Sequence, residues 1–239
     1  MNPPEDPMPG GEPTAVRQRY LHRKTHVDPD RYSMLNPATW QMLQERQRLL
    51  LRLFASRLDR ELGHLDLVEV GCGSGGNLLE LLRFGFSPGR LTGIELLEER
   101  IAKAQEVLPS SVRLYASDAL QIDLPGCSQD IVYQAVVFSS LLDRKFGEKL
   151  AEKMWSWVKP GGAILWYDFV YDNPFNPDVR GVPVKRIRQL FSEARVYAKR
   201  LTLAPPIARR VCAVHPVLYN VFNSLPWLRT HVLCWIEKP

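Results

Sequence analysis

Five short apolar runs in this chain are separated by amphipathic segments with helical spacing. The apolar runs occupy residues 67–70, 91–95, 112–116, 130–137 and 163–169. Between them, in segments such as 98–108 and 146–158, apolar residues recur at intervals of three and four. Strands that alternate with helices form βαβ units, so the pattern predicts an α/β fold with a doubly wound, mostly parallel sheet.

The segments outside this alternation divide the chain further. The proline-rich start, residues 1–16, is expected to be a disordered tail, and residues 17–64 an N-terminal lid and helix. Residues 65–239 are expected to form one α/β domain, with an insert at 170–230 after the fifth strand. Residues 232–236 have the composition of the final strand of the sheet.

A glycine-rich turn follows the first apolar run directly. Gly71, Gly73 and Gly75 lack Cβ atoms, so the backbone can adopt positive φ and approach a ligand, beside the free N–H groups of the next helix. An ordinary tight β-to-α connection is the alternative, and Gly76 also satisfies the dinucleotide spacing G-x-G-x-x-G. Glu69, two positions before the first glycine, favours a cationic ligand, because a carboxylate repels pyrophosphate and attracts an ammonium group.

The sequence from Glu69 to Gly75 resembles the acid-x-G-x-G-x-G motif of the class I methyltransferases that use S-adenosylmethionine. The resemblance runs from about residue 65 to residue 169 and includes the turn Lys159-Pro160-Gly161-Gly162 before the fifth strand. It implies a Rossmann-like sheet of seven strands, S-adenosylmethionine as the cofactor and S-adenosylhomocysteine as the product. Glu69 stands where aspartate is commoner in the family.

Two more acidic residues lie at the ends of strands, where ligands of doubly wound sheets collect. Glu95, after the second strand, can accept hydrogen bonds from both ribose hydroxyls, and Asp118, after the third, can accept one from an adenine amino group. The alternatives are a helix-capping acid and a turn residue. The resemblance assigns Glu69 to the methionine end, Glu95 to the ribose and Asp118 to the adenine. The expected cofactor-binding residues are Glu69, Gly71, Gly73, Gly75, Asn77, Glu95, Leu96, Asp118, Ala119, Gln134 and Tyr32.

Candidates for catalysis and substrate binding follow the fifth strand. Methyl transfer is an in-line displacement that needs a base only for a weak nucleophile, and none of the five histidines lies at a strand end. We therefore expect Asp168 or Tyr167 to accept the proton or orient the acceptor. Tyr171, Asn173 and Arg180 are expected to contact the substrate. Alternatively, Asn173 only builds a turn and Arg180 pairs with a local acid.

Composition and charge narrow the class of protein. The chain has 239 residues and a net charge of +5, but its lysines and arginines form no single basic block, so nucleic acid is not an expected partner. The four cysteines form no C-x-x-C pair, so no metal site is expected, and they fit a reducing cytoplasm. Neither a secretory signal nor a spanning apolar run is present, so we expect a cytoplasmic enzyme.

The acceptor is expected to be a small molecule or a glycan, including a lipid-linked glycan. Segments 32–37, 166–181 and 203–210 are similar to bacterial methyltransferases of polysaccharide and secondary-metabolite gene clusters, which implies a biosynthetic role. A catalytically silent S-adenosylmethionine-binding scaffold is the alternative, and an RNA methyltransferase a weaker one. The basic and apolar segment 205–228 can meet a membrane surface, pack on the sheet or form a dimer contact, so the chain is expected to be a monomer or homodimer.

Overall fold

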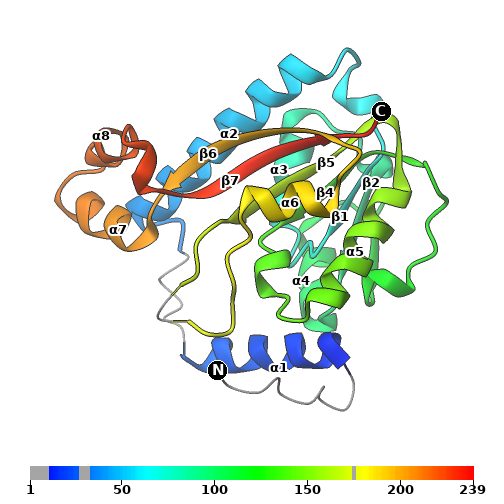
Figure 1. The fold of residues 1–239 in the computed structure, drawn as a ribbon, viewed down its shortest axis with the longest axis horizontal. Helices are drawn as coiled ribbons and strands as arrows, with labels where there is room; N and C mark the ends of the chain where they lie inside the picture. Colours follow the sequence, from blue (N-terminus) through cyan, green and yellow to red (C-terminus); the bar gives the residue numbers. More distant parts are fainter. Residues whose placement is uncertain (1–10, 27–32, 174–175) are drawn as a thin grey trace.

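A computed structural model describes residues 11–26, 33–173 and 176–239 (Figure 1). Its strands are β1 (Leu67–Val70), β2 (Leu91–Glu95), β3 (Arg113–Ala116), β4 (Gln129–Ala135), β5 (Val158–Phe169), β6 (Arg195–Leu203) and β7 (Arg229–Glu237). The α-helices are α1 (Gly11–His26), α2 (Pro37–Arg57), α3 (Gly76–Phe84), α4 (Glu98–Val107), α5 (Arg144–Trp157), α6 (Val184–Leu190), α7 (Pro205–Val214) and α8 (Leu218–Asn223). Short 3-10 turns are η2 (Leu62–His64), η3 (Pro88–Arg90), η4 (Ala119–Gln121), η5 (Phe138–Ser140) and η6 (Pro226–Leu228).

The seven strands form one sheet in the order β3-β2-β1-β4-β5-β7-β6. Strands β1 to β5 pair in parallel, whereas β7 runs antiparallel to both β5 and β6. The prediction of a Rossmann-like, mostly parallel sheet of seven strands is confirmed. The order of the strands reverses between β1 and β4, and ligands of doubly wound sheets bind at such a switch point.

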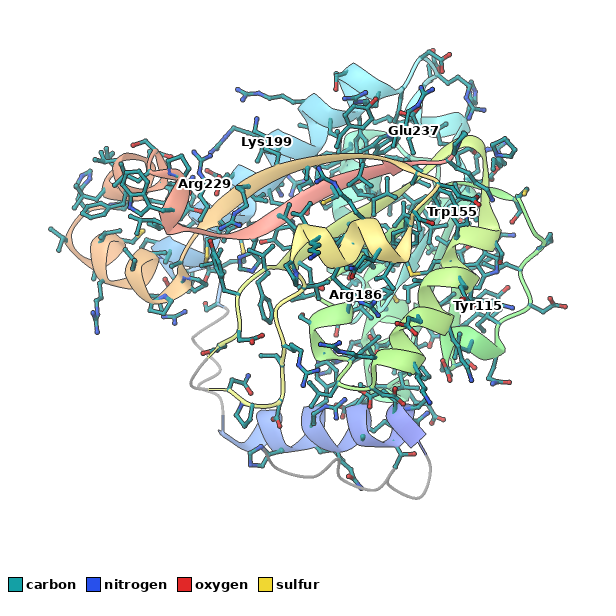
Figure 2. All side chains as sticks on the ribbon, in the orientation of Figure 1. Tyr115, Trp155, Arg186, Lys199, Arg229 and Glu237 are labelled. Carbon is teal, nitrogen blue, oxygen red and sulfur yellow. The ribbon has the colours of Figure 1, made fainter. Side chains whose placement is uncertain are left out.

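Helices cover both faces of the sheet. On one face, Leu50 and Phe54 of α2 and Leu78 of α3 pack against Leu67 of β1. On the other, α5 and α6 cover the sheet, with Trp157 and Trp166 fully buried among their apolar side chains. Figure 2 labels Trp155 on α5 and Arg186 on α6 in this second layer. Both layers bury continuous apolar surface, which is the main favourable contribution to folding.

Three segments differ from the sequence-based expectation. Residues 11–16, expected in a disordered tail, are the first turns of α1, where Pro13 is tolerated and Val16 is buried. The expected turn at 159–162 lies inside β5, because Gly161 and Gly162 exchange backbone hydrogen bonds with Lys238 beyond β7. The insert expected at 170–230 contains a strand of the sheet, β6, and its segment 205–228 is divided into α7, which ends at Val214 before Pro216, α8 and η6.

No helix in the described ranges is both long enough and apolar enough to span a bilayer. Within the same ranges, no cluster of three or more His, Cys, Asp or Glu side chains is arranged to hold a metal ion. All four cysteines, Cys72, Cys127, Cys212 and Cys234, are free thiols.

Candidate functional site

A cavity of about 1110 Å³ opens at the carboxyl edge of the parallel strands. The ends of β1, β2 and β4 form its floor, and α1, which runs along the lower edge of the molecule in Figure 1, forms one wall. Five of the expected cofactor-binding residues line it, namely Gly71, Glu95, Leu96, Asp118 and Ala119. The cavity therefore lies at the position where the fold class binds its ligands.

The glycine turn leaves no room for side chains at its critical positions. Gly71 has a φ of +72°, and a Cβ atom added to it would lie 2.4 Å from Cγ2 of Val137. Gly75, which precedes α3, has a φ of +82°, and its added Cβ would lie 2.8 Å from Cδ1 of Leu108. Only glycine satisfies both the left-handed backbone and the close approach at these two positions.

Glu95 connects the glycine turn to the end of β2. The Gly73 N–H donates to Oε2 of Glu95 over 2.9 Å, and the Leu97 N–H donates to Oε1 over 3.0 Å. Nη1 of Arg100 lies 3.8 Å from the same carboxylate. These contacts hold the Glu95 carboxylate at the cavity wall, where it can accept hydrogen bonds from vicinal hydroxyls.

Asp118 and Ala119 mark the end of the cavity next to β3. Oδ1 of Asp118 accepts a hydrogen bond from the Leu120 N–H over 3.0 Å and so caps η4. The alternative that the sequence left open for Asp118, a turn residue, is thus present as a cap of η4. A carboxylate has further acceptor positions, so capping leaves Asp118 able to accept a bond from an amino group in the cavity.

Glu69 does not line the cavity. Side chains alternate across a strand, so Val70 of β1 faces the cavity and Glu69 faces α3, where its carboxylate is fully buried. Nδ2 of Asn77 donates to Oε1 of Glu69 over 2.6 Å, while Oε2 is buried without a hydrogen-bond partner among the described residues. Burial raises the pKa of Glu69 to about 8.

Gln134 also lies outside the cavity and holds a segment that lines it. Its Oε1 accepts a hydrogen bond from the Val137 N–H over 3.0 Å, and its Nε2 donates to the Tyr167 carbonyl over 3.4 Å. Between them, Val136 has a φ of +59°, a strained value for a β-branched residue, and it contributes to the cavity wall. Tyr32, also expected to bind the cofactor, lies outside the described residues.

Sequence reasoning missed Arg46, which lies in α2. Its Nη2 donates to Oδ1 of Asn77 over 2.7 Å and to Oε2 of Glu80 over 3.2 Å, and its guanidinium lies 5.2 Å from the ring centre of Tyr167. Arg46 thereby extends the Glu69–Asn77 contact into a buried polar network. A signal was present, because Arg46 falls three and four positions before Leu49 and Leu50 on the apolar face of its helix.

Asp168 is fully buried and contacts backbone rather than the cavity. Oδ2 accepts the Ser139 N–H over 3.1 Å, and Oδ1 accepts the Phe169 N–H over 2.9 Å. Burial raises the pKa of Asp168 to about 7. Since Ser140 lines the cavity, Asp168 fixes the segment that forms part of its wall.

Tyr167 is also buried away from the cavity. Its hydroxyl lies 3.0 Å from Oγ1 of Thr202, and its ring stacks on His231 at 5.1 Å between centres. Burial raises the pKa of Tyr167, so the phenol stays protonated at neutral pH. In this conformation Tyr167 is equipped to donate or accept a hydrogen bond but not to act as an anionic base.

The three expected substrate contacts do not converge on the cavity. Tyr171 is half exposed, and its hydroxyl accepts a hydrogen bond from Nη2 of Arg200 over 2.6 Å. Asn173 is exposed. Arg180 lines a separate cleft of about 360 Å³ between α5 and α6, and its backbone N–H donates to the Ser139 carbonyl over 2.8 Å.

Helix α1 is attached to the opposite rim of the cavity by a network that the sequence did not suggest. Nη2 of Arg19 donates to Oε1 of Glu12 over 2.5 Å and to the Ser140 carbonyl over 3.0 Å. The same Glu12 oxygen accepts the Leu142 N–H over 2.7 Å. The Arg100 guanidinium lies 4.2 Å from the ring centre of Tyr20, which links α1 to α4 as well. The only sequence signal was the spacing of seven between Glu12 and Arg19, which places them on one helix face.

Comparison with known proteins agrees with this geometry. Residues 67–162, which include the glycine turn, Glu95 and Asp118, match the family described as "Methyltransferase domain". This segment of the chain is therefore similar to a methyltransferase domain. The match spans β1 to the start of β5, the part of the chain that forms the cavity floor.

Individual relatives share parts of the domain. Trans-aconitate 2-methyltransferase of Paracidovorax citrulli is 31% identical over 130 residues, covering 54% of this chain and 48% of that protein. The chain spans 30% to 48% of the length of the curated relatives that it matches.

Solved structures match over nearly the whole chain. N-methyltransferase NodS from Bradyrhizobium japonicum, in complex with S-adenosylhomocysteine, has a TM-score of 0.67 and 19% identity, covering 94% of this chain and 98% of that one. The 1,6-didemethyltoxoflavin-N1-methyltransferase of Burkholderia thailandensis has a TM-score of 0.66 and 16% identity, covering 100% of this chain and 93% of that one. These likenesses establish the fold of this chain.

The residues at the cavity fit S-adenosylmethionine, the cofactor of the family. Gly71 keeps the turn free of a side chain where a ligand approaches the backbone, and Glu95 presents a carboxylate next to it. The buried Oε2 of Glu69, which lacks a partner among the described residues, is an acceptor behind the same turn. These hydrogen-bond acceptors therefore suit a ligand with hydroxyl, amino and cationic groups.

Proposed function

We propose that this chain transfers a methyl group from S-adenosylmethionine to a small-molecule or glycan acceptor. One observation carries the proposal: the Glu95 carboxylate is bonded to the glycine turn through the Gly73 N–H and faces a cavity at the switch point of the sheet. A ligand with a ribose fits there because both carboxylate oxygens accept hydrogen bonds. The bound cofactor supplies an electrophilic methyl group on a sulfonium.

The residues of the chain have three tasks in this proposal. Glu95 and Asp118 bind the ribose and the adenine, and Leu96 and Ala119 flank them in the cavity wall. Helix α1 excludes water from the cavity, which favours an in-line displacement. Glu69 is proposed to accept a hydrogen bond from the ammonium of the cofactor from behind the turn, and Gly73, Gly75 and Asn77 hold that region together.

Asp168 keeps the proposed role of orienting the acceptor or accepting its proton, and Tyr167 keeps the proposed role of orienting the acceptor. Asp168 supports this role through the segment 138–140, which it holds by a hydrogen bond to the Ser139 N–H. Tyr167 presents a protonated hydroxyl beside Thr202. Tyr171, Asn173 and Arg180 remain proposed substrate contacts, and any joint role for them requires the loop after β5 to move.

The names of two curated relatives support a small-molecule acceptor, because they are a trans-aconitate and a sterol 24-C-methyltransferase. A third relative is named as a tRNA N(3)-cytidine methyltransferase and represents the RNA alternative. A cytoplasmic, bacterial and biosynthetic setting belongs to the same proposal, supported by four free thiols, which suit a reducing compartment. A monomeric or homodimeric state and a peripheral membrane contact through residues 205–228 also belong to this proposal.

Calorimetry with S-adenosylmethionine, followed by assay of methylated product, tests the proposal. We expect Glu95→Ala to weaken cofactor affinity about 10- to 100-fold, because charge-assisted hydrogen bonds to the ribose are lost. Glu106→Ala, an exposed carboxylate on the adjacent helix α4, is the matched control and should bind as the wild type does. Failure of the wild type to bind overturns the proposal. Binding without turnover of any acceptor favours the silent scaffold.

A further inference from the structure

Residues 205–228 form a projecting unit, here called the terminal helical unit. It comprises α7, α8 and η6 and lies at one end of the molecule, beyond the sheet (Figure 1). Its inner side is packed: Ala208, Cys212 and Tyr219 are buried against Ala38 at the start of α2 and Leu203 at the end of β6. The unit therefore has a core contact of its own and a fixed orientation on the body.

The outer side of the terminal helical unit is apolar and exposed. Val214 is 79% exposed, Trp227 is 69% exposed, and Val217 and Val221 are each 56% exposed. The inner side already packs the unit against the body, so these exposed side chains do not contribute to the core. A group of exposed apolar residues marks an interaction surface.

The charge around this apolar surface has one sign. Residues 204–230 contain three arginines, Arg209, Arg210 and Arg229, and no aspartate or glutamate. Figure 2 labels Arg229 at the start of β7, where the unit joins the sheet. Glu45 of α2 contacts the inner side of the unit. Its carboxylate accepts hydrogen bonds from the Thr202 N–H, the Tyr219 hydroxyl and Nδ2 of Asn223, so its charge is paired inside the protein.

We propose that the terminal helical unit rests in the interface of a bilayer that contains anionic lipids. Its valines and Trp227 enter the boundary between headgroups and acyl chains, and the exposed Arg210 contacts the anionic headgroups. Apolar side chains together with cations are the combination that binds such an interface, and indoles prefer that depth. A protein that bound the same surface of the terminal helical unit would need an apolar surface surrounded by acidic residues.

The position of the unit relates the membrane to the cavity. Strand β6 is antiparallel to β7, which is antiparallel to β5, so β6 runs in the same direction as β1 to β5. Its carboxyl end, from which α7 starts, therefore lies at the same edge of the sheet as the cavity. We therefore infer that the acceptor of the methyl group is attached to a lipid or dissolved in the bilayer. This inference rests on the proposed methyl-transfer function.

Vesicle sedimentation of the full chain tests the proposal. We expect binding to vesicles of phosphatidylcholine with 30% phosphatidylglycerol, and at least fivefold weaker binding to phosphatidylcholine alone. Val221→Glu should reduce binding to the anionic vesicles at least fivefold, because a carboxylate would enter the interface. Val107→Glu, at a 51% exposed valine on α4, is the matched control and should bind as the wild type does.

The emission of Trp227 gives an independent readout, because the other five tryptophans are buried or only partly exposed. We expect a blue shift on anionic vesicles that Trp227→Phe removes. Calorimetry with S-adenosylmethionine on Val221→Glu separates the two proposals: retained cofactor binding with lost vesicle binding supports the membrane surface. Absence of wild-type vesicle binding, or a dimer in sedimentation velocity that Val221→Glu dissociates, overturns the membrane proposal and leaves methyl transfer untouched.

Discussion

The backbone N–H of Gly73 lies 2.9 Å from Oε2 of Glu95, so the turn after β1 is bonded directly to the acid at the end of β2. This bond joins two neighbouring strands of the sheet at the wall of the cavity. It makes the position of the Glu95 carboxylate depend on the shape of the glycine turn. Changes to the turn should therefore alter both stability and cofactor binding.

Gly71→Ala should destabilise the domain by about 1–3 kcal/mol, because the residue has positive φ and its new Cβ would overlap Val137. Cofactor affinity should fall with it. Chemical denaturation and calorimetry measure the two effects. Gly76→Ala is the matched control: this glycine begins α3 and has nothing within 4 Å of an added Cβ. Equal stability of Gly71→Ala and wild type would contradict the requirement for glycine at this position of the turn.

Glu12→Gln and Arg19→Ala should each release α1 from the rim of the cavity. Glu12 accepts the Leu142 N–H and pairs with Arg19, which in turn donates to the Ser140 carbonyl. We expect faster hydrogen exchange over residues 11–22 and several-fold faster cofactor release, measured by mass spectrometry and stopped-flow. Gln18→Ala, at an exposed side chain of the same helix, serves as the control. Unchanged exchange in both variants would show that these bonds do not hold the helix.

Glu69→Gln should change how stability depends on pH. Burial raises the pKa of Glu69 from 4.5 to about 8, so between these values the native state binds more protons than the unfolded state. The free energy of unfolding therefore falls as pH rises from about 4.5 to 8, by up to about 5 kcal/mol from this group. Urea denaturation without cofactor at pH 5 and pH 8 should show a smaller fall for Glu69→Gln. An equal fall in the free energy of unfolding for the variant and the wild type would contradict the raised pKa of Glu69.

Asp168→Asn separates catalysis from support. Each carboxylate oxygen accepts a backbone N–H, from Ser139 and from Phe169, so an amide group would oppose one of these donors. We expect a loss of about 1–3 kcal/mol in stability. If Asp168 also accepts the proton of the acceptor, kcat should fall about 100-fold or more and the pH profile should change. Asp123→Asn, at an exposed position, is the control. Unchanged turnover would end the catalytic assignment.

Much of the fold was readable from local pattern. Apolar runs at residues 67–70, 91–95 and 130–137 identified the strands β1, β2 and β4, because burial on both faces of a parallel sheet requires continuous apolar sequence. The meeting of Glu95 and Asp118 at one cavity also followed, since carboxyl ends of parallel strands share an edge.

The misplaced elements depend on contacts between distant parts of the chain. The proline-rich start suggested disorder through residue 16, yet residues 11–16 are helical and α1 is held at the cavity by bonds that span more than 120 positions. Arg46 meets Asn77 across 31 positions, a pairing that no local signal specifies. Tyr171 and Arg180 diverge because the loop after β5 has no periodic pattern to orient them.

The sequence by itself determined the alternation of strands and helices in an α/β domain, the glycine turn and the acids that end β2 and β3. These features depend on backbone freedom and on periodicity, which act over a few residues. Tertiary structure alone decided that Glu69 is buried with Asn77, that α1 closes the cavity and that the terminal helical unit projects. Those outcomes depend on which surfaces meet, because the free energy of burial and pairing is set by partners far away in the chain.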